Sequence, residues 1–204
     1  MFTRAMVTML FGPTLLITMA CAPTGEAPPI AATATPPAAG PGLGAAARPA
    51  AILPAEIASL TITNARMPAP GLLTGGQITR EQMAALRSLG YRTFVNLRPA
   101  DEAGTGWEEE FARSEGIAFE RIPVAGEADL TRDAAERLAA ALHKSGAGPA
   151  MVYCGSGNRV GALLALQARY VDGRSPEEAL VFGRDAGLTG LEPKVRGLLG
   201  LPVD

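Results

Sequence analysis

The sequence predicts an α/β fold in which a mostly parallel central sheet is flanked by helices on both faces. From about residue 60 onward, short β-branched or apolar segments alternate with longer segments whose apolar residues recur at helical spacing. The segment 149–154, PAMVYC, is a short apolar run typical of a strand buried on both faces. It leads through a glycine-rich turn into a helical segment, as the connections of a parallel sheet require.

Four strands are expected in the sheet. LTITNAR alternates polar with apolar residues and contains β-branched side chains, which is typical of a strand. The proline- and glycine-containing segment PAPGLLTGGQ that follows, 68–77, predicts turns and a loop. The expected strands are 60–66, 91–99, 117–124 and 149–154.

Six helices are expected between and after these strands. Thr79 and Gln82 form a capping box before an apolar stripe, and Ser175 precedes Pro176 at another helix start. The acidic run 108–110 favours the positive end of a short helix and is expected to be solvated. The expected helices are 79–90, 106–116, 131–146, 158–173, 175–187 and 192–199.

The chain divides into three parts by composition. Residues 1–21 combine Arg4 with an apolar stretch and end on Ala20-Cys21, which resembles a bacterial lipoprotein signal with Cys21 as the lipidated residue. An ordinary cleaved signal with an incidental cysteine is the alternative. Residues 22–54 are rich in Ala, Pro and Gly and predict a disordered tether. Residues 55–204 form the folded domain, so we expect a periplasmic protein of the bacterial envelope, attached to a membrane only through its lipid.

Composition narrows the classes of partner. The formal net charge is −2 and aromatic residues make up 5%, which gives no reason to expect binding to nucleic acid. His143 is the only histidine and is expected at the surface, and the domain holds a single cysteine, so no histidine cluster or cysteine pair is present for a metal. We therefore expect no metal and no cofactor. A lone domain thiol in an exported protein is either buried and inert or functional.

Cys154 lies where a predicted strand meets the glycine-rich turn, at the sheet edge that holds ligand sites in such folds. The turn and the following helix start direct backbone N–H groups inward, which favours an anion and lowers a thiol pKa. Arg159 can bind two oxygens of a tetrahedral anion. Cys154 and Arg159 are the expected catalytic pair, and the expected phosphate-binding residues are Gly155, Ser156, Gly157, Asn158 and Arg159.

Three segments together resemble a known family: TGGQITREQMAALRSLGYRTFVNLRPADE, FERIPV and VYCGSGNRVGALLAL. In order and spacing they are similar to the beta-lactamase-hydrolase-like (DUF442) bacterial phosphatase domain, which is related to dual-specificity protein tyrosine phosphatases. The resemblance covers roughly residues 58 to 200. It implies a cysteine-phosphatase-like fold, hydrolysis of phosphate monoesters through a phosphocysteine, a phosphorylated substrate and no metal.

Three positions differ from most cysteine phosphatases. The loop between Cys154 and Arg159 is one residue shorter, Tyr153 replaces a histidine, and Val160 replaces a hydroxyl residue that helps to expel the thiolate. The missing hydroxyl predicts slow breakdown of the covalent intermediate. Whether the short loop is catalytically competent stays open at this point.

A general acid is expected on one of two loops that follow strands. Asp129 is the preferred candidate and Glu127 the second, and the other loop offers Asp101 and Glu102. The alternative for Asp129 is that it only helps to start the next helix. Arg98 is either a second contact to the anion or an ion-pair residue.

Two other functions fit part of the pattern. VYCGSGNR alone also resembles rhodanese-like sulfurtransferases, although the segment 175–187 then predicts a helix where that family continues with a strand. A domain that binds phosphate or another oxyanion without turnover is the other alternative. The phosphatase hypothesis requires Cys154 to face the main-chain donors of the loop and Arg159 to be directed at the same position.

Overall fold

The computed structural model describes residues 53–144 and 148–203. The predicted signal peptide with Cys21, and all but the last two residues of the predicted tether, lie outside the described residues. The described part contains every predicted strand and helix apart from residues 145–146, the last two of the predicted helix 131–146.

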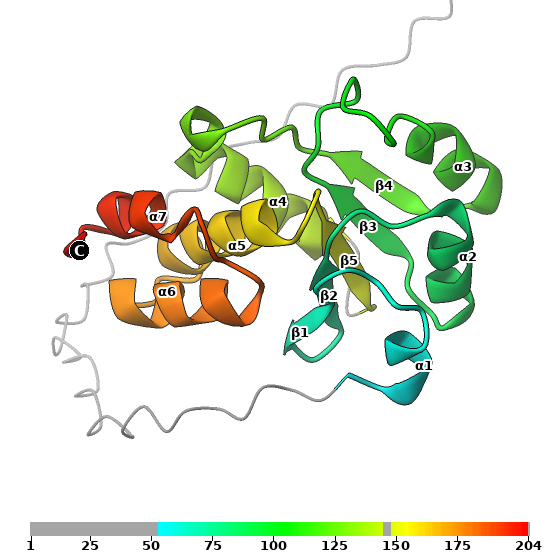
Figure 1. Ribbon diagram of the computed structural model, residues 1–204, viewed down its shortest axis with the longest axis horizontal. Helices are drawn as coiled ribbons and strands as arrows, with labels where there is room; N and C mark the ends of the chain where they lie inside the picture. The colour runs from blue at the N-terminus through cyan, green and yellow to red at the C-terminus, as the bar shows by residue number, and fades with distance from the viewer. Residues whose placement is uncertain (1–52, 145–147, 204) are drawn as a thin grey trace, which may run out of the picture. The chain divides into compact units, whose positions relative to one another are not determined.

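A five-stranded, mostly parallel sheet forms the centre of the fold (Figure 1), which confirms the predicted fold class. The strand order is β1-β2-β5-β3-β4, and only β1 pairs antiparallel, with β2. The central strand β5 is buried along its whole length, as its apolar sequence predicts. The strands are β1 (Arg66–Ala69), β2 (Leu72–Gly75), β3 (Thr93–Asn96), β4 (Ala118–Arg121) and β5 (Ala150–Tyr153).

Helices follow the strands as the sequence predicts, within a few residues at each end. The capping boxes are present at Thr79–Gln82 and Ser175–Glu178. None of the described helices is both long and apolar enough to span a membrane. The helices are α1 (Ala55–Ala58), α2 (Arg80–Ser88), α3 (Glu108–Glu115), α4 (Arg132–Lys144), α5 (Asn158–Tyr170), α6 (Pro176–Asp185) and α7 (Glu192–Leu199), and a 3₁₀ turn, η1, spans Glu127–Asp129.

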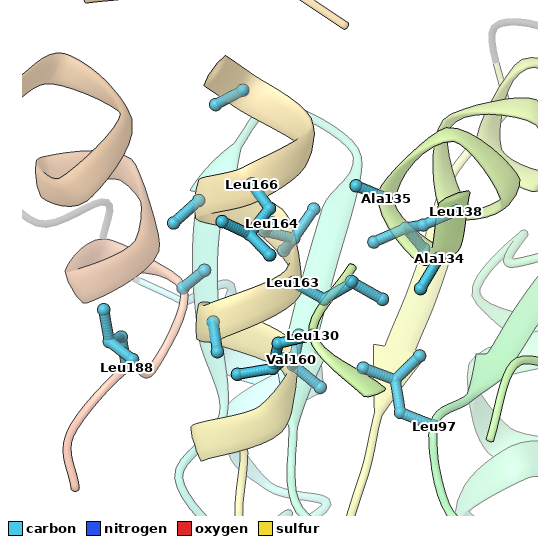
Figure 2. Packing of buried hydrophobic residues seen from close by; sticks show 14 of the residues in the cluster. Leu97, Leu130, Ala134, Ala135, Leu138, Val160, Leu163, Leu164, Leu166 and Leu188 are labelled. Carbon is cyan, nitrogen blue, oxygen red and sulfur yellow. The ribbon is translucent and has the colours of Figure 1, made fainter. Parts of the chain in front are cut away.

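The two faces of the sheet have separate apolar cores. Side chains alternate along β5, so Val152 packs with α4, α5, α6 and α7, whereas Met151 and Tyr153 pack with α1, α2 and α3. Helix α5 lies in the middle of the first layer and is apolar on nearly all sides because other helices surround it (Figure 2). Cys154, the residue after β5, belongs to the α5 face.

Two glycines fix how α5 lies against α6. A Cβ on Gly161 would lie 2.0 Å from the Leu188 nitrogen and 2.6 Å from the Gly183 carbonyl oxygen. A Cβ on Gly183 would lie 2.8 Å from the Gly161 carbonyl oxygen. Because these neighbours are backbone atoms, only glycine at both positions permits α5 and α6 to lie this close. The contact at Gly161 and Gly183 therefore sets the position and rotation of α5.

The start of the domain differs from the prediction. The expected strand 60–66 is mostly a series of turns, with positive φ at Thr61 and Asn64, and the expected loop 68–77 contains a hairpin of β1 and β2. Gly71, at φ 75°, makes the hairpin turn, and Pro68 is tolerated because β1 is an edge strand. Within 60–66, the β-branched Ile62 packs in the apolar core and takes no part in strand pairing.

Candidate active site

The residues after β5 form a tight loop around the Cys154 sulfur. The Gly157 N–H donates to Cys154 Sγ at 3.1 Å. Gly157 has φ 92°, a conformation that side chains disfavour, and α5 begins at the next residue, Asn158. Cys154 is only 1% exposed, so its sulfur lies at the bottom of the loop.

Neighbouring segments hold this loop from the β2 side. Gly76 forms an isolated bridge with Ser156, and the Gln77 N–H donates to the Gly155 carbonyl oxygen at 3.3 Å. The Asn64 side-chain amide donates to the Ser156 carbonyl oxygen at 2.9 Å. Because the carbonyl groups of the loop are bound from outside, its shape is fixed before any ligand enters.

Asn158 holds the loop from the opposite side. Its Oδ1 accepts hydrogen bonds from the backbone N–H groups of Thr189 (2.8 Å) and Leu191 (3.3 Å), between α6 and α7. The Asn158 side chain is therefore engaged in this connection, and its backbone N–H is the group left for the predicted anion contact.

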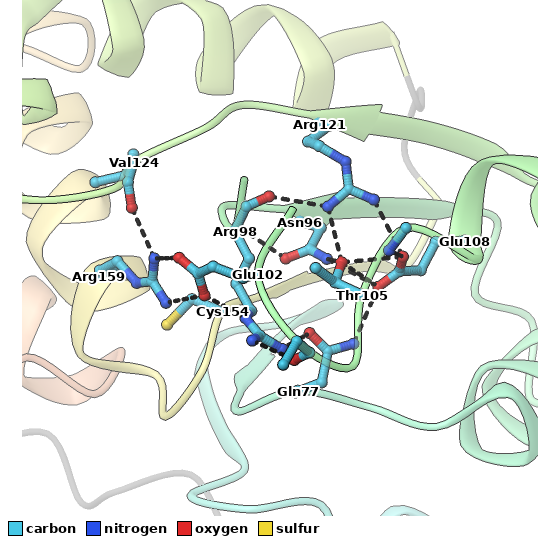
Figure 3. Close-up of polar contacts among 12 residues, drawn as sticks. Gln77, Asn96, Arg98, Glu102, Thr105, Glu108, Arg121, Val124, Cys154 and Arg159 are labelled. Atoms are coloured by element: carbon cyan, nitrogen blue, oxygen red, sulfur yellow. Dashed lines mark hydrogen bonds and ion pairs between the residues drawn. The ribbon is translucent and has the colours of Figure 1, made fainter. Parts of the chain in front are cut away.

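Arg159 is directed toward the loop, with its guanidinium beside Cys154 (Figure 3). Nη1 donates to Glu102 Oε1 at 2.6 Å and to the Val124 carbonyl oxygen at 2.8 Å, and Nη2 donates to Glu102 Oε2 at 3.0 Å. A Cβ on Gly155 would lie 3.3 Å from Nη2. The end-on edge of the guanidinium is thus bound by Glu102, whereas the side-on edge, formed by Nε and the second Nη2 hydrogen, is bound by no carboxylate or carbonyl group of the described residues, and the Cys154 sulfur is the hydrogen-bonding group beside it.

Glu102 lies between two arginines. Its carboxylate accepts from Arg98 Nε at 2.6 Å as well as from Arg159. The hydrogen bond from Arg159 lowers the pKa of Glu102 to about 2, with Arg98 adding to the effect against burial. Hydrogen bonding to Glu102 in turn raises the pKa of Arg159, and the nearby Cys154 contributes. An ionised carboxylate cannot donate a proton, so this geometry suits Glu102 to hold Arg159 rather than to act as the acid.

Arg98 is an ion-pair residue here, one of the two roles predicted from the sequence. Besides Glu102, it donates through Nη1 to Gln77 Oε1 at 2.9 Å and through Nη2 to the Ala103 carbonyl oxygen at 2.7 Å. Each of its three nitrogens is therefore bound within the protein. Arg98 connects the loop after β3 to the loop after β2.

The remaining acidic candidates lie on two exposed loops. Asp129 ends η1, and its Oδ2 accepts N–H groups from Ala125 (2.8 Å) and Gly126 (3.1 Å). This loop begins at Val124, whose carbonyl oxygen binds Arg159, so the loop leaves the sheet at the candidate site. Glu127 and Asp101 are exposed.

The segment that contains Cys154 and Arg159 matches a known protein family. Residues 64–170, about half of the chain, match the family model described as "Beta-lactamase hydrolase-like protein, phosphatase-like domain". The chain belongs to this family. Two relatives named "Beta-lactamase hydrolase-like protein", from Xylella fastidiosa strains Temecula1 and 9a5c, are 34% identical over 111 residues. The match covers 50% of this chain and 24% of each relative, so this chain corresponds to about a quarter of their length.

Solved structures show the same fold at low identity. "Putative phosphatase (DUF442)" from Shewanella putrefaciens CN-32 is 21% identical, with a TM-score of 0.54 over 69% of this chain and 91% of that one. Tk-PTP in the active form is 14% identical, with a TM-score of 0.52 over 66% and 95%. A variant of human DUSP28 is 22% identical, with a TM-score of 0.50 over 67% and 91%. The domain is phosphatase-like and resembles tyrosine and dual-specificity phosphatases in fold.

A buried carboxylate lies behind the candidate site of this family member, and the sequence interpretation missed it. Glu108 was expected in a solvated helix start, yet it is 0% exposed. It accepts hydrogen bonds from five groups, and it forms an ion pair with Arg121 at 3.1 Å. The donors are Gln77 Nε2, Asn96 Nδ2, Thr105 Oγ1, the Gly106 N–H and Arg121 Nη2 (Figure 3).

The Glu108 cluster positions the loop that carries Glu102. Burial opposes the charge of Glu108, but the surrounding hydrogen bonds outweigh it and lower its pKa. Two polar residues that end strands, Asn96 in β3 and Arg121 in β4, were the sequence signal for a shared partner. Single-sequence reasoning could not identify that partner, because three successive acids compete for the role.

Proposed function

We propose that the domain hydrolyses phosphate monoesters through a phosphocysteine formed on Cys154. The observation that carries the proposal is the position of the Arg159 guanidinium, whose side-on edge lies beside the Cys154 sulfur and the amide-rich loop and is occupied by no carboxylate or carbonyl group of the described residues. That edge matches two oxygens of a phosphoryl group, and the loop N–H groups can bind the remaining charge. Glu102 holds the opposite edge and so fixes the direction of the open one.

The reaction has two steps. The Cys154 thiolate attacks phosphorus, an S–P bond forms and the P–O ester bond breaks, and the general acid gives its proton to the leaving oxygen. A water molecule then attacks phosphorus and gives one proton to the acid that was ionised in the first step, the S–P bond breaks, and the products are inorganic phosphate and the thiolate. We assign the proton transfer to Asp129, whose Oδ1 carries no hydrogen bond within the described residues, with Glu127 as the second candidate.

The presence of Val160 after Arg159 affects the expected rates of phosphocysteine formation and breakdown. Its side chain is buried and apolar and cannot donate to the departing thiolate. Breakdown of the phosphocysteine is therefore expected to be slower than its formation. A burst of one leaving group per protein molecule, followed by slow turnover, is the kinetic sign of this imbalance.

Hydrolysis of an aryl phosphate by the full chain tests the proposal. Cys154→Ser should abolish both burst and turnover, and Arg159→Lys should lower kcat/KM by about 100-fold or more, because a point charge replaces a bidentate group. Val160→Ser should accelerate the slow phase. Equal hydrolysis by the wild-type chain and Cys154→Ser contradicts the proposal, whereas cyanide-dependent sulfur release from thiosulfate supports the sulfurtransferase.

Binding of an oxyanion without turnover is the second candidate function, and the low exposure of Cys154 favours it. A thiol that is only 1% exposed presents little surface to the phosphorus atom of a substrate. Calorimetric titration with inorganic phosphate separates the two. Phosphate binding that Arg159→Gln removes, combined with no hydrolysis of any aryl phosphate, supports the binding function.

We also propose that the domain is tethered to the periplasmic side of a bacterial membrane and meets a phosphorylated partner there. Support comes from the sequence of residues 1–54 alone, where Cys21 is the proposed lipidated residue. Replacement of Cys21 by Ser should move the full chain from the membrane fraction to the soluble fraction. A Cys21→Ser chain that remains in the membrane fraction contradicts lipid anchoring.

A further inference from the structure

A groove of about 530 Å³ adjoins the cysteine loop and plays no part in the proposed chemistry. Gln77 is common to both, because its side chain lines the groove and its backbone N–H donates to the Gly155 carbonyl oxygen. The opposite wall comes from the loop that carries Glu102. The lining residues are Gln77, Ile78, Thr79, Arg80, Gly104 and Trp107.

Arg80 differs from the arginines of the candidate site. Its guanidinium carbon lies 5.5 Å from the Trp107 ring centroid and 5.1 Å from that of Phe111. These two rings pack edge to face at 5.8 Å, so they form a fixed platform. Arg98 and Arg159 bind carboxylates, whereas no hydrogen bond or ion pair joins Arg80 to any residue in the described ranges.

The contact with the two rings prepares Arg80 to bind an anion. Cation–π contact restrains the guanidinium while leaving its N–H groups, which lie in the guanidinium plane, available to an acceptor. The adjacent acid, Glu81, is hydrogen-bonded to its own backbone and to Thr79, and the charge of Arg80 is the smallest of the causes that lower the pKa of Glu81. Arg80 is exposed, so a carboxylate brought by a ligand can reach it from solvent.

We propose that the groove binds the polypeptide segment beside a phosphorylated residue and that Arg80 recognises an acidic side chain in it. The inference rests on the proposed phosphatase function. Trp107 supplies the apolar surface for the intervening peptide. Gln77 and Arg80 are three positions apart, which limits their Cα separation to about 10 Å. An extended peptide covers that distance in about three residues, so we place the acid a few positions from the phosphorylated residue.

The test uses two phosphopeptides of one sequence that differ only in Glu or Gln at two positions from the phosphorylated residue. Wild-type kcat/KM should be about threefold to fivefold higher for the Glu peptide, the range expected of a half-exposed ion pair. Arg80→Gln should bring the two peptides within 1.5-fold, and Trp107→Ala should weaken both equally. Equal kcat/KM values of the wild-type chain for the Glu and Gln peptides overturn the inference.

Arg174→Gln is the matched control. Arg174 also lies over an aromatic ring, at 4.3 Å from the Phe182 centroid, but it follows the far end of α5 from the cysteine loop. This variant loses the same charge and the same kind of aromatic contact, together with a 4.0 Å ion pair to Asp172 that Arg80 does not have. It should retain the full preference for the Glu peptide, and loss of preference in Arg174→Gln would assign the effect to net charge instead.

A binding measurement separates failure of this inference from failure of the phosphatase proposal. Fluorescence anisotropy with labelled peptides and the Cys154→Ser chain reports the Glu-to-Gln ratio without turnover. A ratio above three that Arg80→Gln removes supports the groove even if no peptide is hydrolysed. Equal binding of the two peptides, with or without hydrolysis, overturns the proposed role of the groove, and so does binding of neither peptide. Hydrolysis of an aryl phosphate then still tests the phosphatase proposal by itself.

Discussion

Two carboxylates, Glu102 on the loop after β3 and Glu108 at the start of α3, have opposite surroundings. Glu108 is fully buried and receives hydrogen bonds from five groups, whereas the Glu102 side chain is 30% exposed and is held by two arginines. Both have a lowered pKa, yet for Glu108 the hydrogen bonds must outweigh desolvation, and for Glu102 the contact with Arg159 dominates. The buried Glu108 fixes the loop after β3, and the partly exposed Glu102 on that loop orients the catalytic candidate Arg159.

Glu108 and Glu102 are expected to differ in whether their loss affects folding stability or reaction rate. Removal of a buried charge partner leaves other buried charges and donors without compensation, which costs far more than loss of a solvated ion pair. Glu108 substitutions should therefore affect mainly the free energy of unfolding. Glu102 substitutions should affect mainly the orientation of Arg159 and thus the rate.

The largest effect is expected for Glu108→Ala. Loss of the carboxylate leaves the Arg121 charge and several buried donors unpaired, so the free energy of unfolding should fall by about 3 to 5 kcal/mol, measured by urea unfolding. The control is Glu110→Ala on the exposed side of α3, with an expected loss below about 1 kcal/mol. Equal losses in the two variants would show that the buried cluster contributes no more than a surface charge.

Glu102→Gln is expected to lower stability by about 1 to 2 kcal/mol, because charge-assisted hydrogen bonds to Arg98 and Arg159 are lost while size is kept. If hydrolysis is present, kcat should fall by about tenfold with a smaller change in KM, since the guanidinium is misdirected rather than removed. Glu115→Gln, in the exposed pair with Arg87, is the control. Unchanged kcat in Glu102→Gln contradicts the positioning role.

The pH dependence of stability sharpens the contrast at Glu102. Its pKa is lowered to about 2, so its contribution to folding is present above the ordinary value of 4.5 and is lost as pH falls from about 4.5 to about 2. The difference in unfolding free energy between wild type and Glu102→Gln should thus be constant from pH 7 to 5. It should shrink steadily below pH 4.5, and a difference that grows in acid would contradict this assignment.

The smallest effect is expected at Tyr153, which lies beside the buried cluster. Burial raises its pKa and the charge of the nearby Glu108 adds to the effect, yet no hydrogen bond of full geometry joins its hydroxyl to any described residue. Tyr153→Phe should therefore change the unfolding free energy by less than about 1 kcal/mol, toward greater stability. The control is Tyr170→Phe, which removes a 2.9 Å hydrogen bond to Leu198 and should destabilise by about 1 kcal/mol. A large loss for Tyr153→Phe would reveal a partner for its hydroxyl.

Local patterns predicted most of the fold. Capping boxes and apolar spacing located α2 and α6, and the continuous apolar run located β5, because these signals lie within one segment. The hairpin of β1 and β2 was missed, since LLTG owes its strand to pairing with β5 and not to its own alternation. The turns before it were misread because Ile62 is β-branched but serves the core.

The candidate site was predictable only where its residues are adjacent in sequence. Cys154 and Arg159 lie in one continuous segment that runs from the end of β5 into the first turn of α5, so their placement followed from the strand, the glycines and the helix start. The contact of Arg159 with Glu102 joins residues 57 positions apart, and no local pattern selects Glu102 over Asp101 as its partner. The low exposure of Cys154 likewise depends on surrounding loops.

The backbone contact at Gly161 has a consequence for how this domain can change over evolution. Arg159 lies two positions earlier on the same helix, so its direction follows the rotation of α5, and one residue of register amounts to about 100°. Substitutions in the groove can alter which ligands are preferred without disturbing that rotation. Any side chain at Gly161 turns or displaces the helix and with it the guanidinium, so ligand preference is free to diverge while the geometry of the anion site is inherited unchanged.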